Sequence, residues 1–334
     1  MKIIFLGYNA RWPEKKTRAM EAVLGPEICQ IGGPWESYFR YLPHLWLAMH
    51  RYKPHAIVAQ TVCHGLLALF LRPRTPLVVE NHGDLPCRNK KVAKIALRRA
   101  GAFRAVSRFT ANQFFAYGLR HIPPIYIFPP WTDLDLFFKA NVIYKKPRQK
   151  IIVYAGELAF HKGIHVLLEA FCSILSEHPD AKLRIIGKAT DSQYMKEIVF
   201  RAQGLPVSIE KPMAQEKLAK VMTQADVVAV PSLREGFGRV ALEAMACGTP
   251  VVASHVGGLP EIVEHTRTGY LAPPNNSHLL AFWIKHLLEY PHVGEFLGIW
   301  GQKKAREIFS MEKYVGAYKE LFDATIRRNN VRTI

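Results

Sequence analysis

The chain reads ADVVAVPSLREGFGRVALEAMACGTPVVAS over residues 225–254. The apolar run Val227–Val230 is typical of a buried strand. A glycine-containing loop, 235–238, precedes a helical segment, 239–247, and Gly248 suits the position after a helix end. Thr249-Pro250 then opens a second apolar run. The stretch therefore predicts a strand–loop–helix–strand unit of the kind that builds parallel sheets.

Short apolar runs alternate with helical patterns along the rest of the chain. Unbroken apolar strands separated by helices predict an α/β fold with doubly wound parallel sheets. The strands predicted in this way are 3–7, 56–60, 77–80, 125–128, 151–155, 182–186, 227–230 and 250–253.

A polar, basic and proline-containing segment, 139–150, interrupts this alternation and is predicted to be a linker. We therefore expect two Rossmann-like domains, 1–148 and 149–310, with their strand ends facing a cleft. The segment 311–334 begins with a helical pattern, 311–327. This helix packs either on the second domain or back on the first, and the sequence leaves both open.

The loop in the quoted stretch suits a sugar phosphate. Gly236 and Gly238 let the backbone approach a ligand closely, and the following helix N-terminus favours an anion. Glu235 and Glu243 lie eight residues apart, and a carboxylate can accept two hydrogen bonds from a diol. Taken alone, two such glutamates are as consistent with an ordinary charged surface.

The quoted stretch resembles the signature of the retaining glycosyltransferases of group 1, or family 4, which include sucrose synthases, mannosyltransferases and lipopolysaccharide glucosyltransferases. That signature is a Glu-x7-Glu pair, matched here by Glu235 and Glu243. The match covers most of 151–275, with flanking segments at 225–226, 231–232, 243–252, 257–262 and 268–271. The resemblance implies the GT-B fold, two Rossmann-like domains that face each other across a cleft.

The resemblance also implies the reaction. A sugar would pass from a nucleotide-diphosphate sugar, of the UDP or GDP type, to an acceptor hydroxyl, with retention of configuration and without a metal or other cofactor. Glu235 would contact the donor sugar and Glu243 the ribose. The remaining donor-binding residues implied in this loop are Gly236, Phe237, Gly238 and Arg239.

A second loop, 154–163, resembles the family's diphosphate-binding segment. The resemblance implies that Gly156 binds the donor and that Lys162, like Glu235, is catalytic. Lys162 can neutralise a diphosphate as a point charge, although a solvated loop lysine is the simpler alternative. Glu157 departs from the family, which usually has Arg there. The carboxylate turns away or pairs with a basic residue, or Arg234 or Arg239 supplies the missing charge, or the donor site is weakened.

The first domain matches the family less closely. The segment 78–84 follows a predicted strand and is similar to the family's His-containing loop, which implies a catalytic role for His82 beside the donor sugar. A structural histidine is the alternative. Asp133 and Asp135 form a D-x-D pattern typical of metal sites in the other major glycosyltransferase fold, but the GT-B pattern already accounts for them.

The net charge of +18 is unevenly distributed. Residues 1–150 hold 24 Lys and Arg against 8 Asp and Glu, a net charge of +16, and the remaining residues carry only +2. Such asymmetry favours an anionic partner: a lipid surface, a phosphorylated acceptor or a nucleic acid. We expect no nucleic acid because the chain contains no known nucleic-acid motif. A basic face that only favours solubility is the remaining alternative.

A predicted helix, 88–99, concentrates this charge on one side. Its basic side is typical of a helix that lies on anionic lipid. The residues of that face assigned to acceptor or membrane contact are Arg88, Lys90, Lys91, Lys94 and Arg98, with Arg99 beside them.

Five widely spaced cysteines without a CxxC motif argue against a disulfide framework and a zinc site. No run approaches the ~18 apolar residues of a membrane span. We therefore expect a cytoplasmic protein, peripheral on the inner face of the cell membrane, that acts on a lipid-linked or cell-surface glycan precursor. The alternative is a catalytically weak homologue with an altered donor site that binds anionic membrane or glycan.

Overall fold

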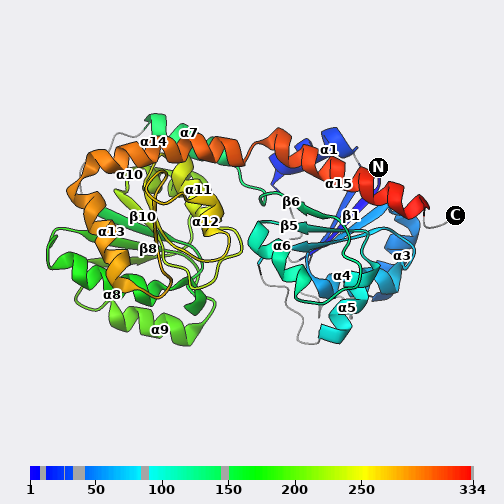
Figure 1. Ribbon diagram of the computed structural model, residues 1–334, viewed down its shortest axis with the longest axis horizontal. Helices are drawn as coiled ribbons and strands as arrows, with labels where there is room; N and C mark the ends of the chain where they lie inside the picture. Colours follow the sequence, from blue (N-terminus) through cyan, green and yellow to red (C-terminus); the bar gives the residue numbers. More distant parts are fainter. Residues whose placement is uncertain (8–12, 26, 33–41, 84–89, 144–149, 332–334) are drawn as a thin grey trace. The chain divides into compact units, whose positions relative to one another are not determined.

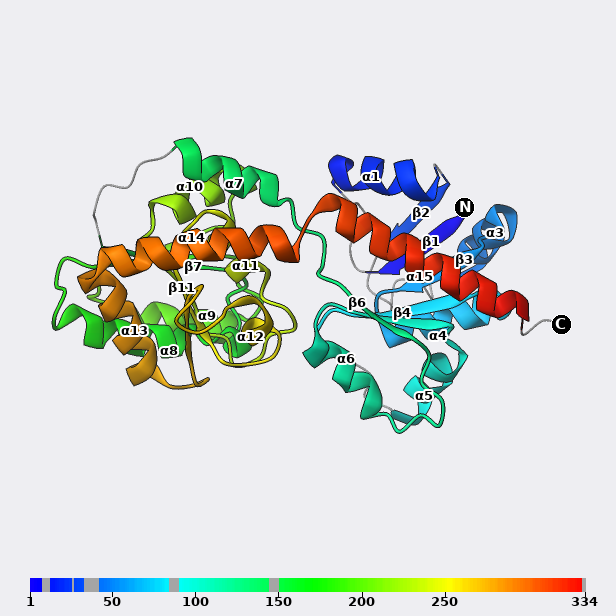
Figure 2. The same cartoon turned by 45° about the horizontal axis from the view of Figure 1, so that its top comes forward.

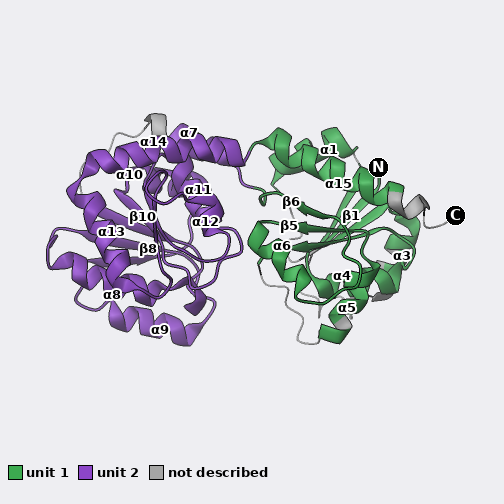
Figure 3. Cartoon of the chain, in the orientation of Figure 1, with its two compact units in different colours: residues 1–131, 310–334 green, residues 132–309 purple. Residues whose placement is uncertain are grey.

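A computed structural model describes the chain except for residues 8–12, 26, 33–41, 84–89, 144–149 and 332–334. The chain forms two compact units (Figure 3). The first unit comprises Met1–Trp131 and Ser310–Ile334, and the second comprises Thr132–Phe309.

The first unit contains a six-stranded parallel sheet of order β2-β1-β3-β4-β5-β6 (Figure 1). Its strands β3 and β4 are buried at every position, as expected for a sheet covered on both faces. The strands are β1 (Ile3–Gly7), β2 (Ile28–Gly32), β3 (Ala56–Ala59), β4 (Leu77–Asn81), β5 (Ala102–Ala105) and β6 (Ile125–Ile127).

Helices cover both faces of this sheet, with α4 and α5 together on one face and α1 and α15 together on the other (Figure 1). Side chains fix two helix starts: Thr61 caps α4, and Ser107 forms a capping box with Thr110 at α6. The helices are α1 (Glu14–Leu24), α3 (Leu42–Tyr52), α4 (Val62–Leu71), α5 (Lys90–Arg99), α6 (Arg108–Phe115) and α15 (Met311–Val331).

The second unit contains another six-stranded parallel sheet, of order β12-β11-β10-β7-β8-β9. Its core joins apolar side chains of β7 and β8 to those of α8 and α13. The strands are β7 (Ile151–Ala155), β8 (Lys182–Ile186), β9 (Val207–Glu210), β10 (Val227–Val230), β11 (Val251–Ser254) and β12 (Tyr270–Ala272).

In this unit α8 and α13 pack together on one face of the sheet, while α7, α10, α11 and α14 gather on the other (Figure 1). A short 3-10 helix, η1 (Phe160–Lys162), follows β7. The helices are α7 (Leu134–Ile143), α8 (Ile164–Leu175), α9 (Ser192–Arg201), α10 (Gln215–Gln224), α11 (Arg239–Ala246), α12 (Leu259–Ile262), α13 (Ser277–Glu289) and α14 (Pro291–Ile308).

These two doubly wound sheets confirm the predicted α/β class with two Rossmann-like domains. Each of the eight predicted strands occurs, with bounds shifted by at most one residue. The apolar pattern did not predict β2, β5, β9 and β12, because these strands are short or carry polar residues. In β5, for example, Arg104 interrupts the apolar pattern but is buried.

The predicted linker was wrong over its first residues. Positions 139–143 lie in α7, which packs on α10 and α11 and so belongs to the second unit. Apart from Lys139, the basic residues that suggested a linker start at Lys145, beyond the end of that helix. Residues 144–149 lie outside the described part of the chain.

The C-terminal helix α15 lies in the first unit beside α1 (Figure 2). The rings of Tyr318 and Phe322 meet the ring of Phe5 on β1 edge-to-face, at centroid distances of 5.8 and 6.2 Å. The last helix of the sequence thus packs on its first strand.

Candidate functional site

The loop between β10 and α11 is held in an unusual backbone conformation. Gly238, the N-cap of α11, has a φ of 108°, and a Cβ there would lie 2.6 Å from Leu259 Cδ2. Gly257 has a φ of 60°, and a Cβ there would lie 1.8 Å from the Glu235 carbonyl oxygen. Only glycine fits such close backbone packing. The loop is therefore pressed against the segment that leads into α12.

Two predicted catalytic residues meet in this loop. Lys162 Nζ lies 2.8 Å from Glu235 Oε2, and the Ser232 hydroxyl donates to the same oxygen at 3.3 Å. The side chains of Lys162 and Glu235 are 22% and 16% exposed, so the ion pair is reachable from solvent. A cation from the loop after β7 and a carboxylate from the loop after β10 thus form an ion pair at the carboxyl ends of these strands.

A glycine makes this meeting geometrically feasible. Gly163 has a φ of 68°, and a Cβ there would lie 2.0 Å from the Pro231 carbonyl oxygen. The Leu233 amide donates to the His161 carbonyl at 2.8 Å, which joins the same two loops. The backbone of η1 can lie against the β10 loop only because residue 163 has no side chain.

Glu243 lies on α11 and is buried, with only 4% of its surface exposed. Burial raises the pKa of Glu243 to about 7, although Arg239, at 3.6 Å, opposes this rise. A buried carboxylate costs free energy unless hydrogen-bond donors reach it. This position therefore favours a ligand that brings hydroxyl donors.

Glu157, the departure from the family pattern, is exposed and paired with a hydroxyl. The Thr190 hydroxyl donates to Glu157 Oε1 at 2.6 Å, and the Tyr154 hydroxyl donates to the Glu157 carbonyl, also at 2.6 Å. The neighbouring Gly156 lies at the end of β7, and its amide donates to Ile186 on β8 at 2.9 Å. The acidic side chain is thus held toward Thr190.

The other donor residues predicted beside Glu235 lie in the same loop or on the first turn of α11. The Phe237 side chain is buried, which leaves mainly its backbone on the surface. Gly236 is half-buried, and Arg239 is exposed on the first turn of α11.

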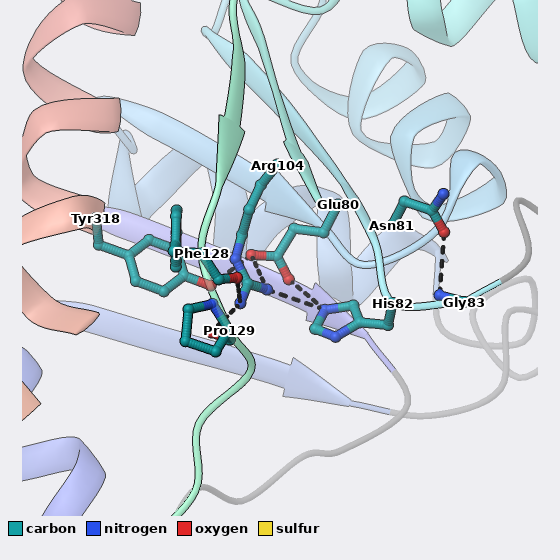
Figure 4. A network of polar contacts seen from close by, with 8 residues as sticks. All are labelled: Glu80, Asn81, His82, Gly83, Arg104, Phe128, Pro129 and Tyr318. Carbon is teal, nitrogen blue, oxygen red and sulfur yellow. Dashed lines mark hydrogen bonds and ion pairs between the residues drawn. The ribbon is translucent and has the colours of Figure 1, made fainter. Parts of the chain in front are cut away.

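His82, in the first unit, directly follows β4 and joins a network of buried polar groups (Figure 4). Its Nε2 lies 2.8 Å from Glu80 Oε2, and Arg104 Nη1 lies 3.3 Å from Glu80 Oε1. The Tyr318 hydroxyl, on α15, donates to Glu80 Oε1. Glu80 and Arg104 are each 1% exposed, and Tyr318 is 2% exposed.

The network keeps Glu80 ionised. Burial alone would raise its pKa, but Arg104, His82 and the Tyr318 hydroxyl lower the pKa of Glu80 to about 2. No sequence motif assigned a functional role to Glu80, Arg104 or Tyr318. A signal was present, because charged residues inside apolar strands need buried partners.

The predicted basic helix is α5, which begins at Lys90. Lys90, Lys91 and Arg98 are exposed and Lys94 is half-buried. Ala93, Ala96 and Leu97 are buried on the opposite side. Arg88 lies outside the described residues.

Within the described residues, no group of three or more His, Cys, Asp or Glu side chains could hold a metal ion. In the same part of the chain, no helix is both long enough and apolar enough to cross a bilayer.

The paired parallel-sheet units and the loops at their strand ends define a two-domain Rossmann-like class. A model of the family "Glycosyl transferases group 1" matches residues 137–305, and one of "Glycosyltransferase Family 4" matches residues 6–136. The chain therefore belongs to the group 1 glycosyl transferases.

Curated relatives include an uncharacterized glycosyltransferase of Methanocaldococcus jannaschii, 35% identical over 48% of this chain and 42% of its own. A D-inositol 3-phosphate glycosyltransferase of Segniliparus rotundus is 38% identical over 43% of this chain and 35% of its own. An N-acetyl-alpha-D-glucosaminyl L-malate synthase of Bacillus anthracis is 26% identical over 84% of this chain and 75% of its own. The chain thus spans less than half the length of the first two.

Solved structures share the fold over nearly the whole chain. Anabaena Alr3699/HepE in complex with UDP has a TM-score of 0.79 at 21% identity, covering 97% of this chain and 100% of that chain. Sucrose-phosphate synthase from Thermosynechococcus elongatus has a TM-score of 0.80 at 22% identity, with the same coverage. These likenesses confirm the predicted GT-B fold.

Proposed function

We propose that this protein is a retaining glycosyltransferase that moves a sugar from a nucleotide-diphosphate sugar to an acceptor hydroxyl. The observation that carries the proposal is the Lys162–Glu235 ion pair at 2.8 Å, on a loop that leads directly into α11. In this pair the Lys162 ammonium can bind a diphosphate, and the Glu235 carboxylate can accept a hydrogen bond from a sugar hydroxyl. Family membership and the glycosyltransferase names of the curated relatives support the same class.

The two charges have separate tasks when a donor binds. Lys162 leaves Glu235 for the diphosphate, where its charge and the α11 N-terminus stabilise the leaving group. Glu235 is then free to accept a hydrogen bond from the donor sugar. This chemistry needs no metal, because protein groups bear the diphosphate charge.

Glu243 accepts hydrogen bonds from the ribose diol in this proposal. Its burial supplies the reason, because two hydroxyl donors offset the cost of a buried carboxylate. We propose a UDP- or GDP-type donor. The UDP and UDP-glucose complexes of Anabaena Alr3699/HepE agree with the first type.

We propose that the acceptor is a lipid-linked or cell-surface glycan precursor and that the protein lies peripherally on the inner face of the cell membrane. The support is the exposed basic side of α5 and the net charge of +16 on residues 1–150. Basic side chains near a bilayer surface are attracted by anionic lipid.

A second candidate rests on Glu157. A carboxylate near the diphosphate repels it and weakens donor binding. The chain would then be a catalytically weak homologue that binds anionic membrane or glycan. The Thr190–Glu157 hydrogen bond favours the first candidate. It ties the carboxylate to a hydroxyl of the protein, and a carboxylate held there is not free to turn toward the diphosphate.

Binding and product assays with Lys162→Ala test the proposed function. We expect UDP or GDP to raise the melting temperature of the wild type, and a nucleoside diphosphate to appear only when donor and acceptor are both present. Lys162→Ala should lower kcat about a hundredfold, since it removes charge stabilisation of the leaving group.

Lys217→Ala, on the exposed surface of α10, is the matched control and should behave as the wild type. A wild type that binds neither nucleotide contradicts the proposal and favours the second candidate. Equal kcat for Lys162→Ala and the wild type contradicts the role of Lys162.

A further inference from the structure

We propose that Glu80 is a positioning residue for His82, which it fixes in the tautomer that carries its proton on Nε2, and that α15 holds Glu80 in this role. The inference rests on the proposed transferase function and on the catalytic role that the family resemblance implies for His82 beside the donor sugar. It adds three residues that the sequence analysis did not assign: Glu80, Arg104 and Tyr318.

The two carboxylate oxygens of Glu80 have different partners (Figure 4). Oε1 accepts from the Tyr318 hydroxyl and faces Arg104 Nη1 at 3.3 Å. Oε2 faces His82 Nε2 at 2.8 Å. Because Oε1 is occupied, Oε2 is oriented toward the imidazole.

The charge of Glu80 decides which atom carries the proton. An ionised carboxylate only accepts hydrogen bonds. An unprotonated Nε2 would place two acceptors 2.8 Å apart, which is repulsive. Nε2 therefore donates to Glu80, and the proton of a neutral His82 ring resides there.

Arg104 also lies near Nε2, at 3.3 Å from its Nη1. Arginine is always a donor, so a protonated Nε2 cannot accept from it. The guanidinium has other acceptors: Nη1 faces Glu80, and Nη2 donates to the Pro129 carbonyl at 3.0 Å. Its Cζ stands 4.4 Å from the Phe128 ring centroid, which fixes its plane. Arg104 thus compensates the charge of Glu80, and His82 Nε2 remains hydrogen-bonded to the Glu80 carboxylate.

The consequence is an oriented acceptor. The other ring nitrogen of His82, Nδ1, points away from Glu80 in Figure 4. In the tautomer fixed by Glu80, Nδ1 has a lone pair and can accept from a sugar hydroxyl. The His82 side chain is 41% exposed, so part of the ring is accessible to a ligand.

The position of the C-terminal helix α15 also matters, because its Tyr318 hydroxyl holds Glu80 Oε1. Tyr318 is 238 residues from Glu80 in sequence and reaches it only because α15 packs in the first unit. A purely structural role for the network would neutralise buried charge without setting the tautomer of His82. The experiment separates these two roles.

The first measurement needs no variant. Long-range 1H–15N correlation spectra of the 15N-histidine-labelled wild type distinguish the two tautomers, and His82→Gln assigns the signal among 14 histidines. We expect His82 to be protonated on Nε2. A ring protonated on Nδ1 instead overturns the inference, whatever the enzyme's activity.

The second measurement uses Glu80→Gln, with Glu197→Gln as a matched control in an exposed ion pair. Glu80→Gln should populate both tautomers and lower kcat at least about tenfold, with the donor KM within about twofold. Glu197→Gln should match the wild type. An unchanged tautomer and kcat in Glu80→Gln overturn the inference.

Glu80→Asp covers the case in which Glu80→Gln does not fold. Aspartate keeps the charge beside Arg104 but withdraws the carboxylate from His82, so kcat should again fall at least about tenfold. Wild-type kinetics in a folded Glu80→Asp contradict the inference. A wild type without transferase activity contradicts the proposed function alone, because the tautomer spectrum still decides the inference.

Discussion

At the scale of the residue, the burial of Glu243 changes the pH at which its carboxyl ionises. The residue is 4% exposed, and burial raises the pKa of its carboxyl to about 7. The folded state therefore binds more protons than the unfolded state between pH 4.5 and 7. Its contribution to the free energy of unfolding is full below pH 4.5 and falls by about 3 kcal/mol as the pH rises to 7.

We predict that Glu243→Gln removes this pH dependence. Urea unfolding at pH 5 and pH 8 measures it, and the stability of Glu243→Gln relative to the wild type should increase with pH. Glu216→Gln, on the exposed start of α10, is the control and should show no such trend. Parallel pH profiles for Glu243→Gln and the wild type would show that the carboxyl is not perturbed.

At the scale of the element, the contact between η1 and the β10 loop depends on Gly163. Its φ of 68° disfavours any side chain, and a Cβ would also meet the Pro231 carbonyl at 2.0 Å. Gly204 has a similar φ of 74° with no neighbour within 4 Å of a Cβ. Substitution of Gly204 by alanine therefore tests backbone strain alone, and substitution of Gly163 tests strain together with a steric clash.

We predict that Gly204→Ala lowers the free energy of unfolding by about 1 kcal/mol, the usual cost of a left-handed conformation for alanine. Gly163→Ala should cost at least about twice as much and weaken nucleotide binding, because η1 must move away with Lys162. Thermal unfolding and calorimetric titration with UDP measure both effects. Equal losses in the two variants would mean that the contact with Pro231 adjusts at no cost.

At the scale of the whole molecule, charge is the dominant asymmetry. The exposed basic side of α5 lies in the half of the sequence that carries a net charge of +16. Each basic residue near an anionic bilayer contributes about 1 kcal/mol of binding. Four of them change vesicle partitioning by orders of magnitude.

We predict that replacing Lys90, Lys91, Lys94 and Arg98 together by alanine lowers binding to anionic vesicles at least about a hundredfold. Co-sedimentation with and without anionic lipid measures it. The control replaces four exposed lysines of the second unit: Lys182, Lys211, Lys217 and Lys220. Wild-type sedimentation that does not depend on anionic lipid would contradict membrane attachment.

The sequence alone determined the α/β class, its two parallel sheets and the loop before α11. These features are local, because apolar runs mark buried strands, and a glycine-containing loop marks the start of a helix. The same local rules placed Glu235 and Lys162 in loops that follow strands, and Glu243 on the helix after the first of these loops.

Only the tertiary structure decided which side chains meet. Lys162 and Glu235 are 73 residues apart, and Glu80 and Tyr318 are 238 apart. The first pair forms because β7 and β10 are neighbours in the sheet, and the second because α15 packs in the first unit. No local pattern encodes either arrangement. The same reason explains the error at 139–143, where contact with α10 and α11 extends a helix into a segment that its basic surroundings marked as linker.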